Sequence, residues 1–148
     1  MLFSQDRRQL RRYFYDAWRK ARNGEVLTPL EQLMGDVIRR HPEYHQLLEA
    51  DPEVGLDRDY TPDHGQTNPF LHLAMHIALG EQRGADRPPG IAVLHRTLAQ
   101  QWGDEHVAEH AMMEVLGEVL WDAQRLGVPP DETAYLARLQ KLVHGRCP

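Results

Sequence analysis

Apolar residues recur every three or four positions along most of this 148-residue chain, which is the spacing of an amphipathic helix. Alternation with a period of two, the pattern of a half-buried strand, does not persist in any segment, and β-branched residues are sparse. The chain is also close to the usual length of one domain. We therefore predict an all-α fold, a single-domain helical bundle of about six or seven helices that covers residues 1–148.

Capping residues and helix breakers place the ends of these helices. Thr28, Pro29 and Glu31 have the order of a capping box. Asn68, directly before a proline, is a second helix start. The predicted helices cover residues from about 5–22, 29–41, 42–49, 69–82, 90–102, 105–125 and 131–143. Residues 51–67 show no period and are rich in Asp, Pro and Gly, so we predict a long loop there.

Charge is unevenly distributed along the chain. Residues 1–22 hold seven Lys/Arg and two Asp/Glu, whereas the whole chain has a net charge of −5. The predicted helix at about 5–22 is therefore basic, and it is a candidate surface for nucleic acid, anionic lipid or an acidic partner. The acidic remainder argues against general affinity for nucleic acid, because it repels phosphate. We favour a structural role, in which Phe14 and Trp18 pack against the bundle and the arginines face acidic residues.

The cysteine content and the hydropathy of the chain indicate in which cellular compartment the protein is expected. Cys147 is the only cysteine, which excludes an intramolecular disulfide and a cysteine-rich zinc site. No apolar run approaches the ~18 residues that span a bilayer. The first residues also lack the apolar stretch of a signal peptide. We therefore expect a cytoplasmic protein without a membrane segment.

Two pairs of histidines are the best candidates for chemistry. His72 and His76 are four residues apart in a segment that is apolar almost all round, so both should lie on one face of a buried helix. His106, His110 and Glu114 repeat the spacing of four on a later predicted helix, on a different stripe from its main apolar face. If the two helices are neighbours, the four imidazoles and the carboxylate converge.

Imidazole-rich ligand sets are typical of transition metals rather than of calcium or magnesium. We therefore predict a metal site, for zinc or iron, formed by His72, His76, His106 and His110, with Glu114 as a fifth ligand or a base. Neither the Glu-x-x-His pattern of di-iron bundles nor the HExxH signature of zinc proteases is present, so the sequence does not say whether the protein is an enzyme. In the alternative interpretation, the four histidines are structural and form hydrogen bonds within the core.

A different function for the chain is a non-catalytic interaction module or a homodimer. Its contact surface would be the basic first helix or the helix at 105–125. Trp121 lies beside the histidine stripe of the second of these, and a tryptophan is costly to expose, so we expect this face to pack against something.

The remaining histidines are weaker candidates. His41 and His45 are also four apart, but the proline at 42 breaks the helix between them. His64 lies in the predicted loop, where it could close over a pocket. His95 borders the apolar face of its helix, at the core or its rim.

Long stretches of the sequence resemble one bacterial family. They include FSQDRRQLRRYFYDAW near the start, NPFLHLAMHIALGEQ in the middle and GDEHVAEHAMMEVLGEVLWDAQR towards the end, and so extend over nearly the whole chain. The family is uncharacterised and is catalogued as domain of unknown function 1841. The resemblance implies a small helical protein. It implies no activity, cofactor or site residue, so the histidine prediction rests on the residues alone.

Overall fold

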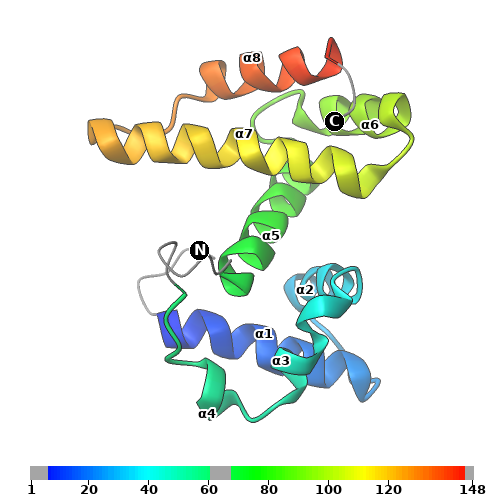
Figure 1. Ribbon diagram of the computed structural model, residues 1–148. Coiled ribbons are helices and arrows are strands. Elements are labelled where there is room, and N and C mark those ends of the chain that lie inside the picture. The colour runs from blue at the N-terminus through cyan, green and yellow to red at the C-terminus, as the bar shows by residue number, and fades with distance from the viewer. Residues whose placement is uncertain (1–6, 61–67, 146–148) are drawn as a thin grey trace. The chain divides into compact units, whose positions relative to one another are not determined.

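The structure is a computed structural model that describes residues 7–60 and 68–145. Every regular element in that part of the chain is helical, so the predicted all-α class is confirmed (Figure 1). None of the described helices is long and apolar enough to span a membrane. The elements are α1 (Arg7–Arg22), α2 (Pro29–Arg39), the 3₁₀-helix η1 (Pro42–Tyr44), α3 (His45–Glu49), α4 (Pro52–Gly55), α5 (Pro69–Ala85), α6 (Ile91–Trp102), α7 (Glu105–Leu126) and α8 (Glu132–Val143).

The described residues thus hold eight α-helices, where six or seven helices were predicted. The extra one, α4, corrects the prediction of a long loop over residues 51–67. It begins after Asp51, whose side chain accepts a hydrogen bond from the backbone amide of Glu53. Four residues are too few to show an apolar period, so the sequence pattern did not reveal it. The single helix predicted at 42–49 is divided into η1 and α3.

The predicted helix starts at Thr28 and Asn68 are confirmed by their hydrogen bonds. The Thr28 hydroxyl accepts from the amide of Glu31 at 3.2 Å, and the Glu31 carboxylate accepts from the amide of Thr28 at 2.9 Å. The Asn68 side chain accepts from the amides of Phe70 and Leu71 at the start of α5. These contacts satisfy backbone donors that the first turn of a helix leaves without an intrahelical partner.

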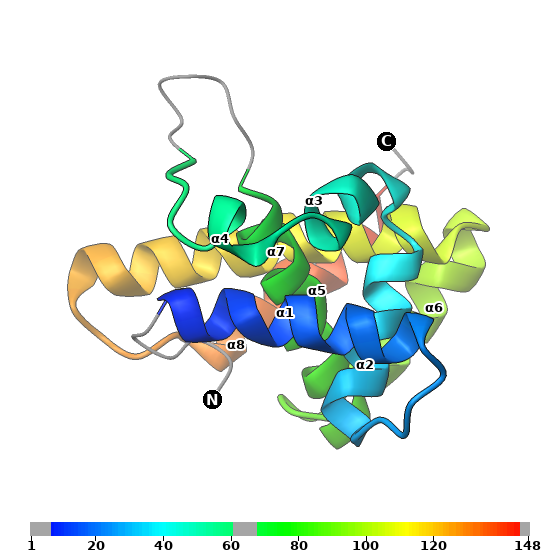
Figure 2. The same cartoon turned by 90° about the horizontal axis from the view of Figure 1, so that it is seen from below.

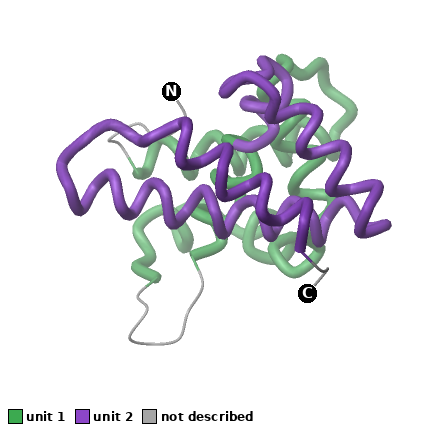
Figure 3. Tube along the Cα trace, turned by 90° about the horizontal axis from the view of Figure 1, so that it is seen from above, with its two compact units in different colours: residues 1–78 green, residues 79–148 purple. Residues whose placement is uncertain are grey.

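The chain divides into two compact units, residues 1–78 and 79–148 (Figure 3). We call them unit 1 and unit 2. Helix α5 continues through the boundary, so that its first part belongs to unit 1 and its last turns belong to unit 2. That the whole chain is one domain stays a prediction.

In unit 1, α1 packs against α2 and α3 (Figure 2). Phe14 and Trp18, the predicted inward face of α1, are 0% and 6% exposed, so that prediction is confirmed. They belong to an apolar core whose other members are Tyr15, Ala17, Met34, Val37, Ile38, Leu48, Leu56, Phe70, Leu73, Ala74 and Ile77.

All arginines of α1 except Arg11 face acidic residues, as its structural interpretation predicts. Arg7 pairs with Asp59 at 2.8 Å. Arg8 contacts Asp57, and this hydrogen bond holds the pKa of the Asp57 carboxyl below its usual value. Both pairs are exposed, so they add little to the stability of the fold. The positive charge of α1 therefore has acidic partners within unit 1.

In unit 2, α6, α7 and α8 pack against one another (Figure 1). Gly103 and Gly127 end α6 and α7 with φ of 69° and 66°, a conformation that glycine adopts without strain. The Tyr135 hydroxyl of α8 donates to Gln82 of α5 at 2.8 Å, and burial raises the pKa of Tyr135. Buried apolar side chains of these helices include Ile91, Leu98, Met112, Leu116, Val119 and Leu139.

We expect Gly55→Ala to destabilise the protein, because Tyr15 fills the space beside Gly55. A Cβ at position 55 would overlap the Tyr15 hydroxyl oxygen and lie 3.3 Å from a methyl group of Leu47. The free energy of unfolding should fall by roughly 1–2 kcal/mol, a usual cost of overpacking.

The background Tyr15→Phe provides the control for this prediction, because it removes the hydroxyl oxygen and leaves the ring. Urea denaturation followed by circular dichroism compares the four proteins. Gly55→Ala should cost much less in the Tyr15→Phe background. An equal cost in both backgrounds would show that the hydroxyl contact is not the cause.

Candidate functional site

Three histidines meet in unit 1. His72 and His76 lie one turn apart on α5, and their ring centroids are 5.0 Å apart. His41, shortly after the end of α2, lies against both rings. Its centroid is 5.0 Å from that of His72 and 4.6 Å from that of His76. We call these three residues the unit 1 histidine cluster.

Two hydrogen bonds orient His41. Its Nδ1–H donates to the backbone carbonyl of Val37, one turn earlier, at 2.8 Å. Because a carbonyl only accepts, the lone pair of a neutral His41 is on Nε2. That atom lies 3.1 Å from Nε2 of His72, which donates to it when no cation lies between them. A carbonyl behind one ring nitrogen is the arrangement that usually orients a metal-binding histidine.

The spacing of the ring nitrogens suits a metal ion. Zinc–nitrogen bonds are ~2.0–2.1 Å long, which places bound nitrogens about 3–4 Å apart. The Nε2 atoms of His41 and His72 already have this separation. One nitrogen of His41 and one of His76 lie within 4.8 Å of each other, so His76 is close enough to His41 to be a third ligand.

The surroundings of the cluster are aromatic and largely buried. His41 and His76 are 1% and 0% exposed, and His72 is partly exposed. Tyr44 stacks on His41 with ring centroids 5.5 Å apart and an angle of 8° between the planes. Burial raises the pKa of Tyr44, so its phenol is neutral at pH 7. Of the three histidines, His72 is therefore the one in contact with solvent.

His45, the other member of the predicted weak pair, does not join the cluster. Its Nε2 donates to the carbonyl of Ile38 at 2.8 Å, and its ring stacks on Trp18 with centroids 4.6 Å apart. The proline at 42 separates His41 from His45, as predicted. The break at Pro42 made His41 a weak candidate in the sequence, but His41 reaches the cluster from beyond the end of α2. No periodicity relates position 41 to 72 and 76, so the only sequence signal was a histidine just after a predicted helix end.

The second predicted pair lies in unit 2. His106 and His110 are one turn apart on α7, with ring centroids 4.2 Å apart, and both are partly buried. Glu114, one turn further on, is exposed. Each predicted pair thus lies on one face of its own helix. That the four histidines and Glu114 bind one ion stays a prediction, and His64 lies outside the described residues.

His95 belongs to a mixed cluster within unit 2 and is 5% exposed. One of its ring nitrogens and one oxygen each of Glu105 and Glu109 lie within 4.8 Å of one another. Arg83 places its Nη1 3.0 Å from Nε2 of His95 and 3.1 Å from Oε1 of Glu105. The guanidinium is already the cation of this cluster, and a metal ion would have to displace it. These residues are therefore the weaker metal candidate.

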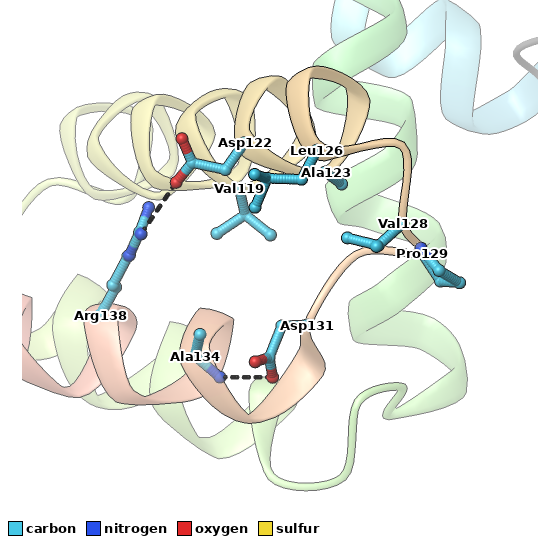
Figure 4. Close-up of a pocket in the computed structure, with 9 residues that line it drawn as sticks. All are labelled: Val119, Asp122, Ala123, Leu126, Val128, Pro129, Asp131, Ala134 and Arg138. Atoms are coloured by element: carbon cyan, nitrogen blue, oxygen red, sulfur yellow. Dashed lines mark hydrogen bonds and ion pairs between the residues drawn. The ribbon is translucent and has the colours of Figure 1, made fainter.

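A small pocket of about 230 Å³ lies between the C-terminal half of α7 and the start of α8 (Figure 4). Its apolar lining consists of Val119, Ala123, Leu126, Val128, Pro129 and Ala134. Asp122 pairs with Arg138 at 3.0 Å, and Asp131 accepts a hydrogen bond from the first turn of α8. Because both carboxylates have partners and the lining includes no histidine or cysteine, this pocket is not a metal site.

A protein-family model described as Domain of unknown function (DUF1841) matches residues 6–141 of the chain. The match includes His41 and both predicted histidine pairs. No curated protein and no solved structure matches the chain. The family description states no ligand or reaction, so the geometry of the residues is the basis for any functional conclusion.

Proposed function

The chain belongs to the family described as Domain of unknown function (DUF1841), and we propose that it is a metal-binding protein that holds a transition-metal ion at the unit 1 histidine cluster. The observation that carries the proposal is the 3.1 Å separation of the Nε2 atoms of His41 and His72, with the ring of His76 against both. Neutral imidazoles favour zinc, iron, copper or nickel. Among these we expect zinc or iron.

A purely structural role explains less of this arrangement. One hydrogen bond between His41 and His72, with the Val37 carbonyl behind it, is enough to satisfy buried ring nitrogens. The third imidazole adds nothing to that bond, but its ring lies against both others, where it would supply a third nitrogen to a bound ion. Three protein ligands leave the fourth position of a tetrahedral zinc ion open for water, which zinc activates in hydrolytic enzymes.

The sequence pattern also names His106, His110 and Glu114 as ligands of the same ion. This part of the proposal rests on residue spacing alone. A titration of the variant His106→Ala with Co²⁺ decides whether His106 is a ligand. Weaker binding by that variant adds His106 to the ligand set, and unchanged binding limits the set to unit 1.

We expect purified protein to bind Co²⁺, a spectroscopic substitute for zinc, in a saturable one-to-one titration of visible absorption. His72→Ala should weaken binding at least roughly tenfold, because it removes one nitrogen of the closest pair. His72 is partly exposed, so the substitution should preserve the fold, which circular dichroism checks.

The matched control is His144→Ala, which removes an exposed histidine just after the end of α8. It should bind Co²⁺ as the wild type does. If wild type and His72→Ala bind equally, or if neither binds, the unit 1 histidine cluster is not a metal site.

A further inference from the structure

Helix α7 carries a row of exposed side chains along one face. Glu114, Glu118, Trp121 and Arg125 follow one another at intervals of four, three and four residues, so they lie on one narrow stripe. We call it the α7 stripe. Trp121 is 65% exposed there. We expected from the sequence that this face packs against something, and the described residues leave most of Trp121 uncovered.

The order of charges on the α7 stripe is self-complementary. Glu118 lies one turn before Trp121, and Arg125 lies one turn after it. If two copies of α7 lie antiparallel about a two-fold axis close to Trp121, Glu118 of each copy faces Arg125 of the other. The two tryptophans then meet at the centre, with an ion pair on each side. A parallel arrangement would instead place like charges opposite each other.

We propose that the protein forms a symmetric homodimer through the α7 stripe, independently of metal binding. Charge complementarity favours a second copy as the partner. Every copy of the stripe carries a glutamate on one side of Trp121 and an arginine on the other, so two copies can form both ion pairs. A central tryptophan with charged residues around it is also the usual composition of an interaction hot spot.

The charges of the α7 stripe remain able to pair between copies. Within the chain, Glu118 lies 3.7 Å from Arg138 and Arg125 lies 3.6 Å from Asp122. All four side chains are at least partly exposed, and exposed pairs of this length are weak in water. A carboxylate and a guanidinium also each offer further hydrogen-bonding positions, so the new pairs need not break the existing ones.

We expect a weak dimer. The stripe is about 16 Å long, from eleven residue steps of ~1.5 Å. One helix face of this length can bury less surface area than the roughly 800 Å² per partner that stable complexes bury. A Kd of the order of 10–100 µM is therefore expected.

Sedimentation velocity over protein concentrations of roughly 5–500 µM, which bracket that Kd, tests the proposal. A chelator is present, so metal bridging cannot contribute and the metal proposal is not at stake. Glu118→Arg and Arg125→Glu should each raise the Kd for dimerisation at least roughly tenfold, because each places like charges opposite each other. The double variant Glu118→Arg/Arg125→Glu should return close to the wild-type Kd, because the ion pairs are restored with exchanged signs.

Recovery in the double variant is a result that damage to the fold cannot produce. Trp121→Ser should also abolish the dimer. Arg96→Glu, a charge reversal at an exposed position of α6, should leave it unchanged. A wild type that stays monomeric over the whole range, or a double variant as weak as the single ones, overturns the proposal.

Discussion

Replacing Arg11 with methionine should lower the free energy of unfolding by about 3–5 kcal/mol. The Arg11 side chain lies inside unit 1, with 1% of the residue exposed. Its Nη1 donates to three backbone carbonyls of the segment around α4: Gly55 at 3.0 Å, Leu56 at 3.2 Å and Arg58 at 2.7 Å. Methionine has a similar length and no donor, so these carbonyls would lose their shared partner in a buried place.

The environment of Arg11 makes the loss large. Its guanidinium lies 4.7 Å from the ring centroid of Phe70 and 5.6 Å from that of Tyr60, so water has little access to it. Burial, more than the nearby charge of Arg7, lowers the pKa of Arg11 from its usual value. Arginine nevertheless stays charged at neutral pH. The carbonyls and the aromatic faces are what stabilise that buried charge.

Arg12→Met is the matched control, because Arg12 is the next residue of α1 and half of its side chain is exposed. It should change the free energy of unfolding by no more than about 0.5 kcal/mol. Urea denaturation followed by circular dichroism measures both variants. Arg11→Lys, which keeps the charge, provides a second value if the methionine variant does not fold. Similar losses for Arg11→Met and Arg12→Met would contradict the assigned role.

Zinc at a hundredfold excess over its Kd should stabilise the folded protein by about 2.7 kcal/mol, if it binds only the folded state. Ligating imidazoles must be neutral, so protons compete with the metal. The gain should therefore shrink as the pH is lowered. Melting curves with a chelator, with zinc and with iron measure the shift and show which metal causes it.

The variants His76→Ala and His45→Ala separate the metal effect from ordinary loss of stability. Both remove a histidine of unit 1, but only His76 belongs to the unit 1 histidine cluster. The measured quantity is the shift of the melting temperature on adding metal. A variant that melts at a lower temperature without metal can therefore still be compared with the wild type. His76→Ala should lose the shift, and His45→Ala should keep it. A wild type that melts at one temperature in all three conditions would mean that the histidines are structural.

Features formed by neighbouring residues could be predicted from the sequence by itself. The capping box of Thr28 and Glu31 and the spacing of His72 and His76 each involve residues three or four apart. Helix geometry sets the distance between such residues whatever the rest of the fold does. For the same reason the inward face of α1 was predicted correctly. The helix α4 was not, because four residues give no periodic signal.

Features that join distant parts of the chain were decided only by the tertiary structure. His41 reaches His72 across 31 positions, and the carbonyls that hold Arg11 lie 44 to 47 positions away. The exposure of Trp121 was also decided by the tertiary structure. The residues of a helical stripe have the same spacing in the sequence whether a neighbouring element covers them or not. Periodicity in the sequence indicates which side chains share a face of one helix. Which faces of two helices contact each other depends on how the whole helices pack. The candidate site was therefore half visible in the sequence, as a pair on α5, and its third histidine came from the tertiary contact that brings His41 against that helix.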